Sequence, residues 1–171
     1  MHPYDIRPAT LADLEILDQI FEGARAYMRK EGNTVQWQTG PFKSDIERDI
    51  KTGLLMVLAN KKDMPDAGEI EGVFFAQVFP EPTYLKIDGA WIDDEKPYIT
   101  IHRLASRGRK PGVSDAAIDW CKERSGSVRI DTHETNLSMI RAIRRNGFTY
   151  CGIIIIADKT PRLAYQWVKE D

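Results

Sequence analysis

A basic loop that ends in a glycine joins a predicted strand to a predicted helix in the second half of this chain. The strand covers 98–105, and apolar residues recur at helical spacing after the loop. Such a junction leaves the first N–H groups of the helix unpaired beside the positive end of its dipole. Gly112 permits close approach of a ligand, and Arg107, Arg109 and Lys110 add positive charge to the loop. The pattern favours a phosphate or pyrophosphate site, and a solvated basic turn is the alternative.

The residues after Gly112 do not fit two common phosphate-binding motifs. A P-loop places Lys followed by Ser or Thr after its second glycine, whereas Val113 and Ser114 stand here. The G-x-G-x-x-G pattern of dinucleotide-binding folds is absent from the sequence. Neither motif therefore identifies the anion.

Helix and strand signals cover most of the chain. Thr10 and Asp13 form a capping pattern before an apolar stripe with helical spacing, and a second capping pattern at 44–47 starts a helix that ends at Gly53. The expected elements are helices over 10–32 and 44–53, strands over 54–60, 70–79 and 98–105, a helix from 113, a strand over 127–132, a helix from 136, and strands over 148–157 and 163–168. This order predicts an α/β (α+β) sandwich with a mixed sheet.

Composition limits the function classes. The chain has 171 residues, 42% of them hydrophobic and 29% charged, which predicts one soluble domain over 1–171. A net charge of −2 argues against general binding to nucleic acid or to an anionic membrane. The sequence shows no secretory signal, and its two cysteines make neither a disulfide framework nor a zinc site, so we expect a cytoplasmic protein without a metal.

Three segments carry a resemblance to a known family. The run R-K-P-G-V-S at 109–114, between a strand and a helix, resembles the R/Q-x-x-G-x-G/A signature of the GNAT superfamily of N-acetyltransferases. Asn136 with its helix and the N-G-F run at 146–148 resemble the superfamily's N-x-x-(M/A)…G-F segment. Residues 6–10 resemble its opening strand and first helix, and the order of elements agrees over nearly the whole chain.

The resemblance implies a mostly antiparallel mixed sheet flanked by helices, with one strand splayed from its neighbour. It implies transfer of an acetyl group from acetyl-coenzyme A to a primary amine of a small molecule or peptide, by direct attack on the thioester. Backbone groups of Leu104 and Ala105 would bind the pantetheine arm and the thioester oxygen, and those of 109–114 the pyrophosphate. The implied cofactor-binding residues are Leu104, Ala105, Arg109, Lys110, Gly112, Val113, Ser114, Asn136, Met139 and Arg145, the last near the adenosine 3′-phosphate.

Two positions depart from the family pattern. Ser114 stands where Gly or Ala is usual, and its hydroxyl is expected to be tolerated. Ile143 stands where the family often has the tyrosine that protonates the departing thiolate. This second departure keeps open a non-catalytic acyl-CoA-binding sensor or interaction module on the same fold. A binder of another phosphorylated ligand is a third reading.

Acetylation of an amine needs a base, because an alkyl ammonium group has a pKa near ~10.4. Histidine suits base work near neutrality, and the candidates are His133, at the end of a predicted strand, and His102, on the strand before the loop. For His102 the alternative is a sheet histidine satisfied by a neighbour. Asp131 and Glu134 are further candidates, and a capping and turn cluster is the alternative for both.

Two further segments bear on the acceptor and on assembly. Gln36 and Trp37 lie between the first two helices, where the family often builds its acceptor pocket. Trp37 either packs over a substrate or closes the edge of the core. The apolar run at 153–156 fits a homodimer edge as well as it fits the core.

Overall fold

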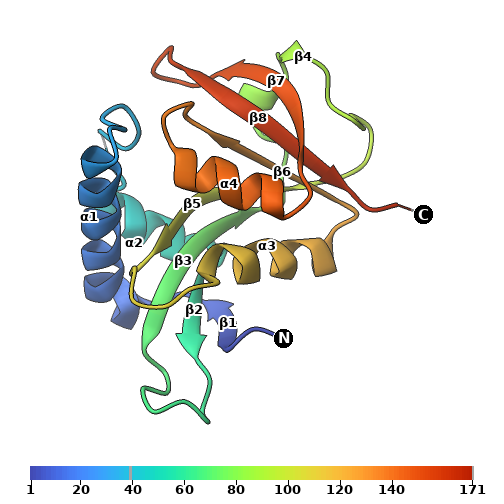
Figure 1. Cartoon of the computed structure of the whole chain (residues 1–171). Coiled ribbons are helices and arrows are strands. Elements are labelled where there is room, and N and C mark those ends of the chain that lie inside the picture. Colours follow the sequence, from blue (N-terminus) through green and yellow to red (C-terminus); the bar gives the residue numbers. More distant parts are fainter. Residues whose placement is uncertain (39, 171) are drawn as a thin grey trace.

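A computed structural model of the chain describes residues 1–38 and 40–170 (Figure 1). In this part of the chain the strands form one sheet in the order β1-β2-β3-β5-β6-β8-β7-β4. The strands are β1 (Tyr4–Pro8), β2 (Leu55–Asn60), β3 (Ile70–Gln77), β4 (Asp88–Gly89), β5 (Ile99–Ser106), β6 (Ser127–Thr132), β7 (Thr149–Ile155) and β8 (Pro161–Val168). The helices are α1 (Leu14–Lys30), α2 (Lys43–Thr52), α3 (Val113–Arg124) and α4 (Leu137–Arg145), with 3-10 turns at Leu11–Asp13 and Pro82–Tyr84.

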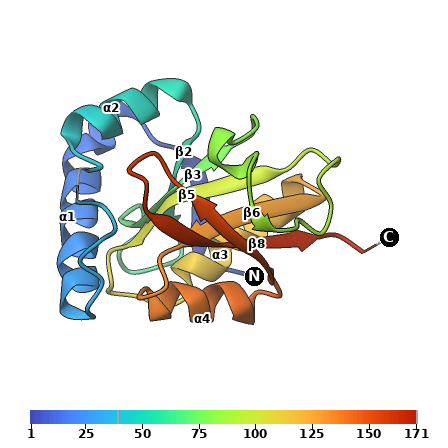
Figure 2. The same ribbon diagram turned by 90° about the horizontal axis from the view of Figure 1, so that it is seen from above.

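The helices cover both faces of the sheet (Figures 1 and 2). Leu17 of α1 and Ile46 of α2 pack with Val57 on one face, whereas Ala117 of α3 packs with Leu58 on the other. Because successive strand residues point to opposite faces, β2 and β3 are buried on both sides. The expected mixed, mostly antiparallel sheet flanked by helices is confirmed.

Strands β5 and β6 form the parallel pair of the sheet, and they separate soon after they meet. Their pairing covers only Ile99–Ile101 against 128–130, whereas β5 continues to Ser106 and β6 to Thr132. Beyond Ile101 the two strands therefore leave an opening in the sheet. This is the splay that the family resemblance implied.

A bulge marks the strand β5 at the opening. Its pairing with β3 shifts between Val73 and Phe75, and Arg103 has a φ of 53°. A residue other than glycine pays a conformational cost in this region, so neighbouring contacts must hold it. One of them is the ion pair from the Arg103 Nη1 to the Asp49 Oδ2 on α2, at 2.5 Å.

Local sequence signals explain most element boundaries. The Asp13 carboxylate accepts the Thr10 N–H at 2.8 Å, and Gly53 ends α2 with a φ of 73°. The expected start of α2 at Ser44 is wrong. The Asp45 carboxylate caps the N–H of Phe42 at 2.9 Å, so the helix already includes Lys43 and Ser44.

The structure also shows the surroundings of the two cysteines and of the apolar run near the C-terminus. Cys121 and Cys151 are buried and unpaired, and burial raises the pKa of the Cys121 thiol to about 12. In the apolar run at 153–156, Ile154 is buried with Tyr84 and Trp91, whereas Ile155 is exposed. Among the helices of the described residues, none has both the length and the apolar character needed to cross a membrane.

Candidate active site

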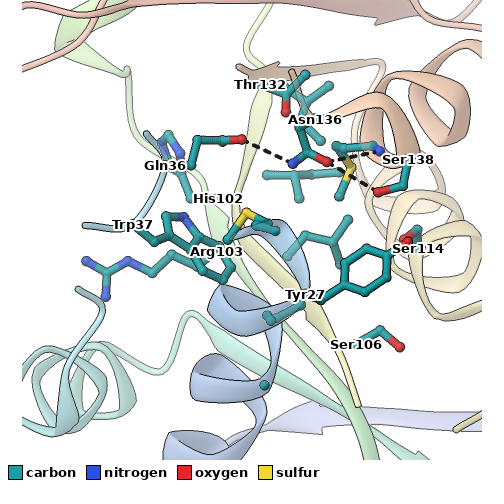
Figure 3. Close-up of a pocket in the computed structure, with 18 of the residues that line it drawn as sticks. Tyr27, Gln36, Trp37, His102, Arg103, Ser106, Ser114, Thr132, Asn136 and Ser138 are labelled. Atoms are coloured by element: carbon teal, nitrogen blue, oxygen red, sulfur yellow. Dashed lines mark hydrogen bonds between the residues drawn. The ribbon is translucent and has the colours of Figure 1, made fainter. Parts of the chain in front are cut away.

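The opening between β5 and β6 forms a cleft of about 630 Å³ (Figure 3). Its wall includes Tyr27 and Met28 of α1, the β5 segment from Ile101 to Ser106, and the end of β6. The start of α4 closes one side through Asn136 and Met139. The cleft therefore has strand residues of β5 and β6 along it and residues of three helices at its sides.

The start of α3 offers unpaired backbone donors at this cleft. Within the described residues, no acceptor pairs with the N–H groups of Arg109, Lys110, or the three residues 113–115. Gly112 precedes the helix with a φ of 85°, and Ser114 lines the cleft. Unpaired N–H groups at a helix N-terminus suit an anion. The backbone N–H groups at the start of α3 therefore still suit the predicted anion site.

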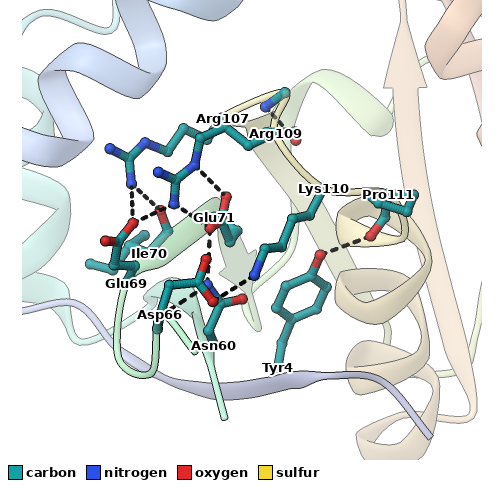
Figure 4. A network of polar contacts seen from close by, with 12 residues as sticks. Tyr4, Asn60, Asp66, Glu69, Ile70, Glu71, Arg107, Arg109, Lys110 and Pro111 are labelled. Carbon is teal, nitrogen blue, oxygen red and sulfur yellow. Dashed lines mark hydrogen bonds and ion pairs between the residues drawn. The ribbon is translucent and has the colours of Figure 1, made fainter. Parts of the chain in front are cut away.

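The basic side chains of the loop have other partners (Figure 4). Three carboxylates of the β2–β3 hairpin receive them, and the pairs are Arg107 with Glu69 at 3.3 Å, Arg109 with Glu71 at 2.5 Å and also with Glu69, and Lys110 with Asp66 at 2.7 Å. The hydrogen bond from Lys110 lowers the pKa of Asp66, and that from Arg109 lowers the pKa of Glu69. The positive charge of the loop is therefore largely neutralised by the hairpin.

The remaining cofactor candidates divide into two groups. The cleft is lined by Leu104, Ala105, Ser114, Asn136 and Met139, but not by Arg109, Lys110, Gly112, Val113 or Arg145. Val113 packs in the core, and Arg145 pairs with Asp115 at 2.8 Å. The Asn136 side chain caps α4 through the Met139 N–H at 3.3 Å and donates to Gln36 at 3.1 Å.

A second cleft, of about 660 Å³, adjoins the first. It lies between the segment around Trp37, the first two turns of α2, the end of β3 and the turn before β8. Five residues line both clefts, namely Gln36, Trp37, His102, Arg103 and Asp131. The two clefts therefore meet where β5 and β6 begin to separate.

His102 stands at this meeting point and has a fixed partner. Its Nε2 lies 2.8 Å from the Glu81 Oε2, and Glu81 also accepts the N–H and the hydroxyl of Thr83. Burial alone would raise the pKa of Glu81, but the hydrogen bond and charge of His102 outweigh it and lower this pKa to about 2. Glu81 is thus a carboxylate across the working pH range.

His133 has a different environment. It is buried, lines neither cleft, and its Nδ1 accepts the Thr135 N–H at 3.2 Å. Burial lowers the pKa of His133, and the charge of Arg162 lowers it further. The structure therefore brings His102, and not His133, to the meeting point of the clefts.

Asp131 and Trp37 complete the meeting point. The Tyr84 hydroxyl donates to the Asp131 Oδ2 at 2.6 Å. Trp37 packs edge-to-face on Phe21, with ring centroids 5.4 Å apart, and also lines both clefts. Trp37 therefore packs at the edge of the core and also forms part of the pocket wall, as the two alternatives had it.

Sequence reasoning missed Glu81 and Arg162, both of which line the second cleft. Glu81 lies 21 residues before His102, in a segment expected only to be a loop. Arg162 precedes the strand expected from 163. Neither residue has a local motif that would have pointed to a site.

Known structures resemble this chain, although no protein-family model and no curated protein sequence matches it. A GNAT-family acetyltransferase from Streptococcus agalactiae is 30% identical, with a TM-score of 0.86 over 98% of this chain and 96% of that one. A GNAT-superfamily phosphinothricin acetyltransferase from Sinorhizobium meliloti, solved with AcCoA, is 17% identical, with a TM-score of 0.62 over 98% and 89%.

An aminoglycoside acetyltransferase solved with coenzyme A and kanamycin is 18% identical, with a TM-score of 0.62 over 96% of this chain and 94% of that one. The last two structures are similar to this chain in fold alone. The Streptococcus protein is also similar in sequence, over almost the full length of both chains. This chain belongs to the GNAT family of acetyltransferases, which use acetyl-coenzyme A as acetyl donor.

Proposed function

We propose that the chain is an N-acetyltransferase acting on a primary amine of a small molecule or peptide, within one cytoplasmic domain over 1–171. The observation that carries the proposal is the meeting of two clefts at His102, Arg103 and Asp131. One cleft includes Ser114, from the helix start with unpaired N–H groups, and the other is lined by five carboxylates and two guanidinium groups. A negative cleft attracts a cationic amine.

The residues of the first cleft fit acetyl-coenzyme A. The hydroxyl of Thr132, buried at the cleft, has no partner within the described residues, and the N–H groups at 113–115 suit a pyrophosphate. When bound, acetyl-coenzyme A supplies an acetyl thioester. Leu104 and Ala105 would flank the pantetheine arm, and Asn136 and Met139 would border it from α4. Arg145 would lie toward the 3′-phosphate.

His102 is the base that the geometry supports best. Its Nε2–H donates to Glu81, so that the other ring nitrogen is left to accept a proton from the amine. The Glu81 carboxylate then stabilises the imidazolium. Asp131 offers a second carboxylate to the ammonium group before it loses its proton. His133 is the weaker candidate, because it lines neither cleft.

Ile143 favours a second candidate, a non-catalytic acyl-CoA sensor. Its side chain is fully buried in the core and cannot donate a proton to a thiolate. In the enzyme, the thiolate would leave without a donor at this position. The two candidates differ in one result, because both bind acetyl-coenzyme A but only the enzyme releases free thiol when an amine is added.

The test is calorimetric titration with acetyl-coenzyme A, with ATP and NAD as controls, followed by thiol release on a panel of primary amines. We expect selective binding, and thiol release that His102→Gln lowers by about 10²–10⁴ without weakening binding. His2→Gln, which changes a histidine paired with Asp119 away from the clefts, is the matched control. Binding without release for every amine would establish the sensor, and an unaffected His102→Gln would return the role of base to His133.

A further inference from the structure

Arg162 is a buried cation in the second cleft without a carboxylate partner. The residue is 4% exposed and lines the cleft from the start of β8. Its Nη1 donates to the Thr160 hydroxyl and to the Pro161 carbonyl, both at 2.8 Å. No carboxylate of residues 1–38 and 40–170 lies within 4.0 Å of its guanidinium nitrogens. Its Nε and Nη2 have no hydrogen-bond acceptor among these residues either.

The other basic side chains of this cleft are paired. Arg103 contacts Asp49 at 2.5 Å, and His102 contacts Glu81 at 2.8 Å. A second buried arginine, Arg129, is 1% exposed and has the Asp94 carboxylate at 2.9 Å. Arg162 therefore differs from these three basic side chains, each of which has a carboxylate partner.

Leaving a buried charge without a counter-charge is costly, and burial lowers the pKa of Arg162 accordingly. The charges of Asp131 and Asp158 oppose this effect from a distance. An anion seated in the cleft would remove most of the cost. Because a guanidinium group binds carboxylates and other oxyanions through two parallel hydrogen bonds, the free Nε and Nη2 suit such a group.

We propose that Arg162 binds an anionic group of the acceptor, so that the acceptor is a small amine that also carries a carboxylate or a similar oxyanion. This proposal rests on the proposed function and names its substrate class. The acetylated nitrogen would lie at His102 and Asp131, where the clefts meet.

The register of the sheet limits the length of this acceptor. Asp131 pairs with Ala164, and Arg162 lies two residues before Ala164 on the same face of β8. Diagonal neighbours of this kind are roughly 7–8 Å apart. The amine and the anionic group must therefore lie within the span of one small molecule. An extended polyamine has no group that satisfies Arg162.

The experiment compares matched acceptors that differ in the group next to the amine. L-Alanine, L-methionine and L-glutamate are each tested against the corresponding α-carboxamide, and glycine is tested against aminomethylphosphonate to separate carboxylate from phosphonate. We expect kcat/KM for at least one acid to exceed that for its amide by about tenfold or more. Arg162→Met should reduce this preference to near unity, and Arg162→Lys should keep part of it.

Two controls guard against loss of the fold. Calorimetric binding of acetyl-coenzyme A should be the same in Arg162→Met as in the parent protein. Arg124→Met, which changes an arginine stacked on Trp120 outside both clefts, should keep the preference for the acid. A parent enzyme that accepts amides as well as acids, or an Arg162→Met variant that keeps the preference, overturns the proposal.

A binding measurement separates this proposal from the proposed function. The same acids and amides are titrated into the protein saturated with coenzyme A. Acids that bind more tightly than amides, in a manner that requires Arg162, support the anion site even if no acceptor is acetylated. Equal binding of acids and amides together with acetylation of other amines overturns the anion site and leaves the N-acetyltransferase function in place.

Discussion

At the scale of single residues, the pair of His102 and Glu81 decides what the meeting point of the clefts can do. The carboxylate fixes one ring nitrogen of His102 and is itself held by Thr83. The pKa of Glu81 is lowered to about 2, so the carboxylate is charged and can stabilise a proton on the ring. A histidine between a fixed carboxylate and an open cleft is suited to accept a proton.

Replacing this carboxylate should therefore lower activity with little effect on cofactor binding. We expect Glu81→Gln to reduce kcat by about 10- to 100-fold, because the neutral amide no longer stabilises the imidazolium. The pH–rate profile should also move, whereas calorimetric binding of acetyl-coenzyme A should not. A variant with the parent's kcat and pH profile would show that Glu81 only supports the loop.

The same residue predicts a dependence of stability on pH. The folded pKa of Glu81 is about 2 and the ordinary value is 4.5, so its contribution is complete above the ordinary value and is lost as the pH falls toward 2. The free energy of unfolding of the parent should exceed that of Glu81→Gln by about 2 kcal/mol near neutrality. Urea unfolding at several pH values should show this difference shrinking in acid, and a constant difference would contradict the assignment.

Residue roles were the part of the site least open to prediction from sequence. His133 follows a strand, where functional groups often gather, but its ring is satisfied by the turn that contains Thr135. The role proposed for His102 depends on Glu81, which the fold brings to it from a loop without a recognisable pattern. The loop at 109–114 was recognisable because its helix start has a sequence signature. The partners of its basic side chains could not be recognised from the sequence, because they lie on a hairpin about forty residues earlier.

At the scale of elements, the β2–β3 hairpin supports the loop before α3 along its length. The Glu71 side chain is fully buried and contacts Arg109, while its backbone carbonyl accepts the Arg107 N–H at 2.8 Å. The next residue, Gly72, leaves room for Val113, the first residue of α3. From the other side, the Tyr4 hydroxyl donates to the Pro111 carbonyl at 2.8 Å.

Glu71→Gln should therefore weaken the binding of the nucleotide part of the cofactor. We expect the KM for acetyl-coenzyme A to rise by about tenfold with kcat nearly unchanged, since the buried charge that accepts two hydrogen bonds from Arg109 is removed. Activity with S-acetyl-pantetheine, which lacks the pyrophosphate, should not change. Glu69→Gln, which alters a more exposed partner of the same arginine, is the matched control and should have a smaller effect.

Gly72 gives a second prediction for this contact between elements. A Cβ at Gly72 would lie 2.3 Å from the Val113 Cγ1 and 3.2 Å from the Ala105 carbonyl oxygen. Gly72→Ala should lower the free energy of unfolding by about 1–3 kcal/mol and weaken acetyl-coenzyme A binding, because α3 must move. Adding Val113→Ala should restore much of the binding. Chemical denaturation and calorimetry of both variants check this, and a double variant no better than Gly72→Ala would refute the contact.

At the scale of the whole molecule, the sheet consists of two halves joined at a short seam. One half contains β1, β2, β3 and β5, and the other contains β6, β8, β7 and β4. The strands at the seam pair over three residues each, at Ile99–Ile101 and 128–130. The overall order of elements could be predicted from capping patterns and periodicity. The seam could not be predicted from them, because the pattern of β5 does not show where its neighbour departs.

A ligand that contacts both halves should keep the seam closed on heating. At a concentration about 100 times its Kd, coenzyme A should add about 2.7 kcal/mol, or roughly 5–11 °C in Tm. Adenosine 3′,5′-bisphosphate lacks the pantetheine arm and should add less at the same multiple of its own Kd if the seam opens on heating. Differential scanning calorimetry of both mixtures tests this, and equal shifts would mean that the halves unfold as one unit.

The ion pairs between the loop and the hairpin also bear on how this enzyme responds to its medium. A phosphate held by solvent-facing lysines and arginines is released as ionic strength rises, because mobile ions screen the attraction. Here the carboxylates of the hairpin already neutralise those cations, and backbone dipoles are left to face the ligand. Affinity for the cofactor should therefore persist in concentrated salt. An engineer who wants tighter binding would gain more from stiffening the loop than from adding charge to it.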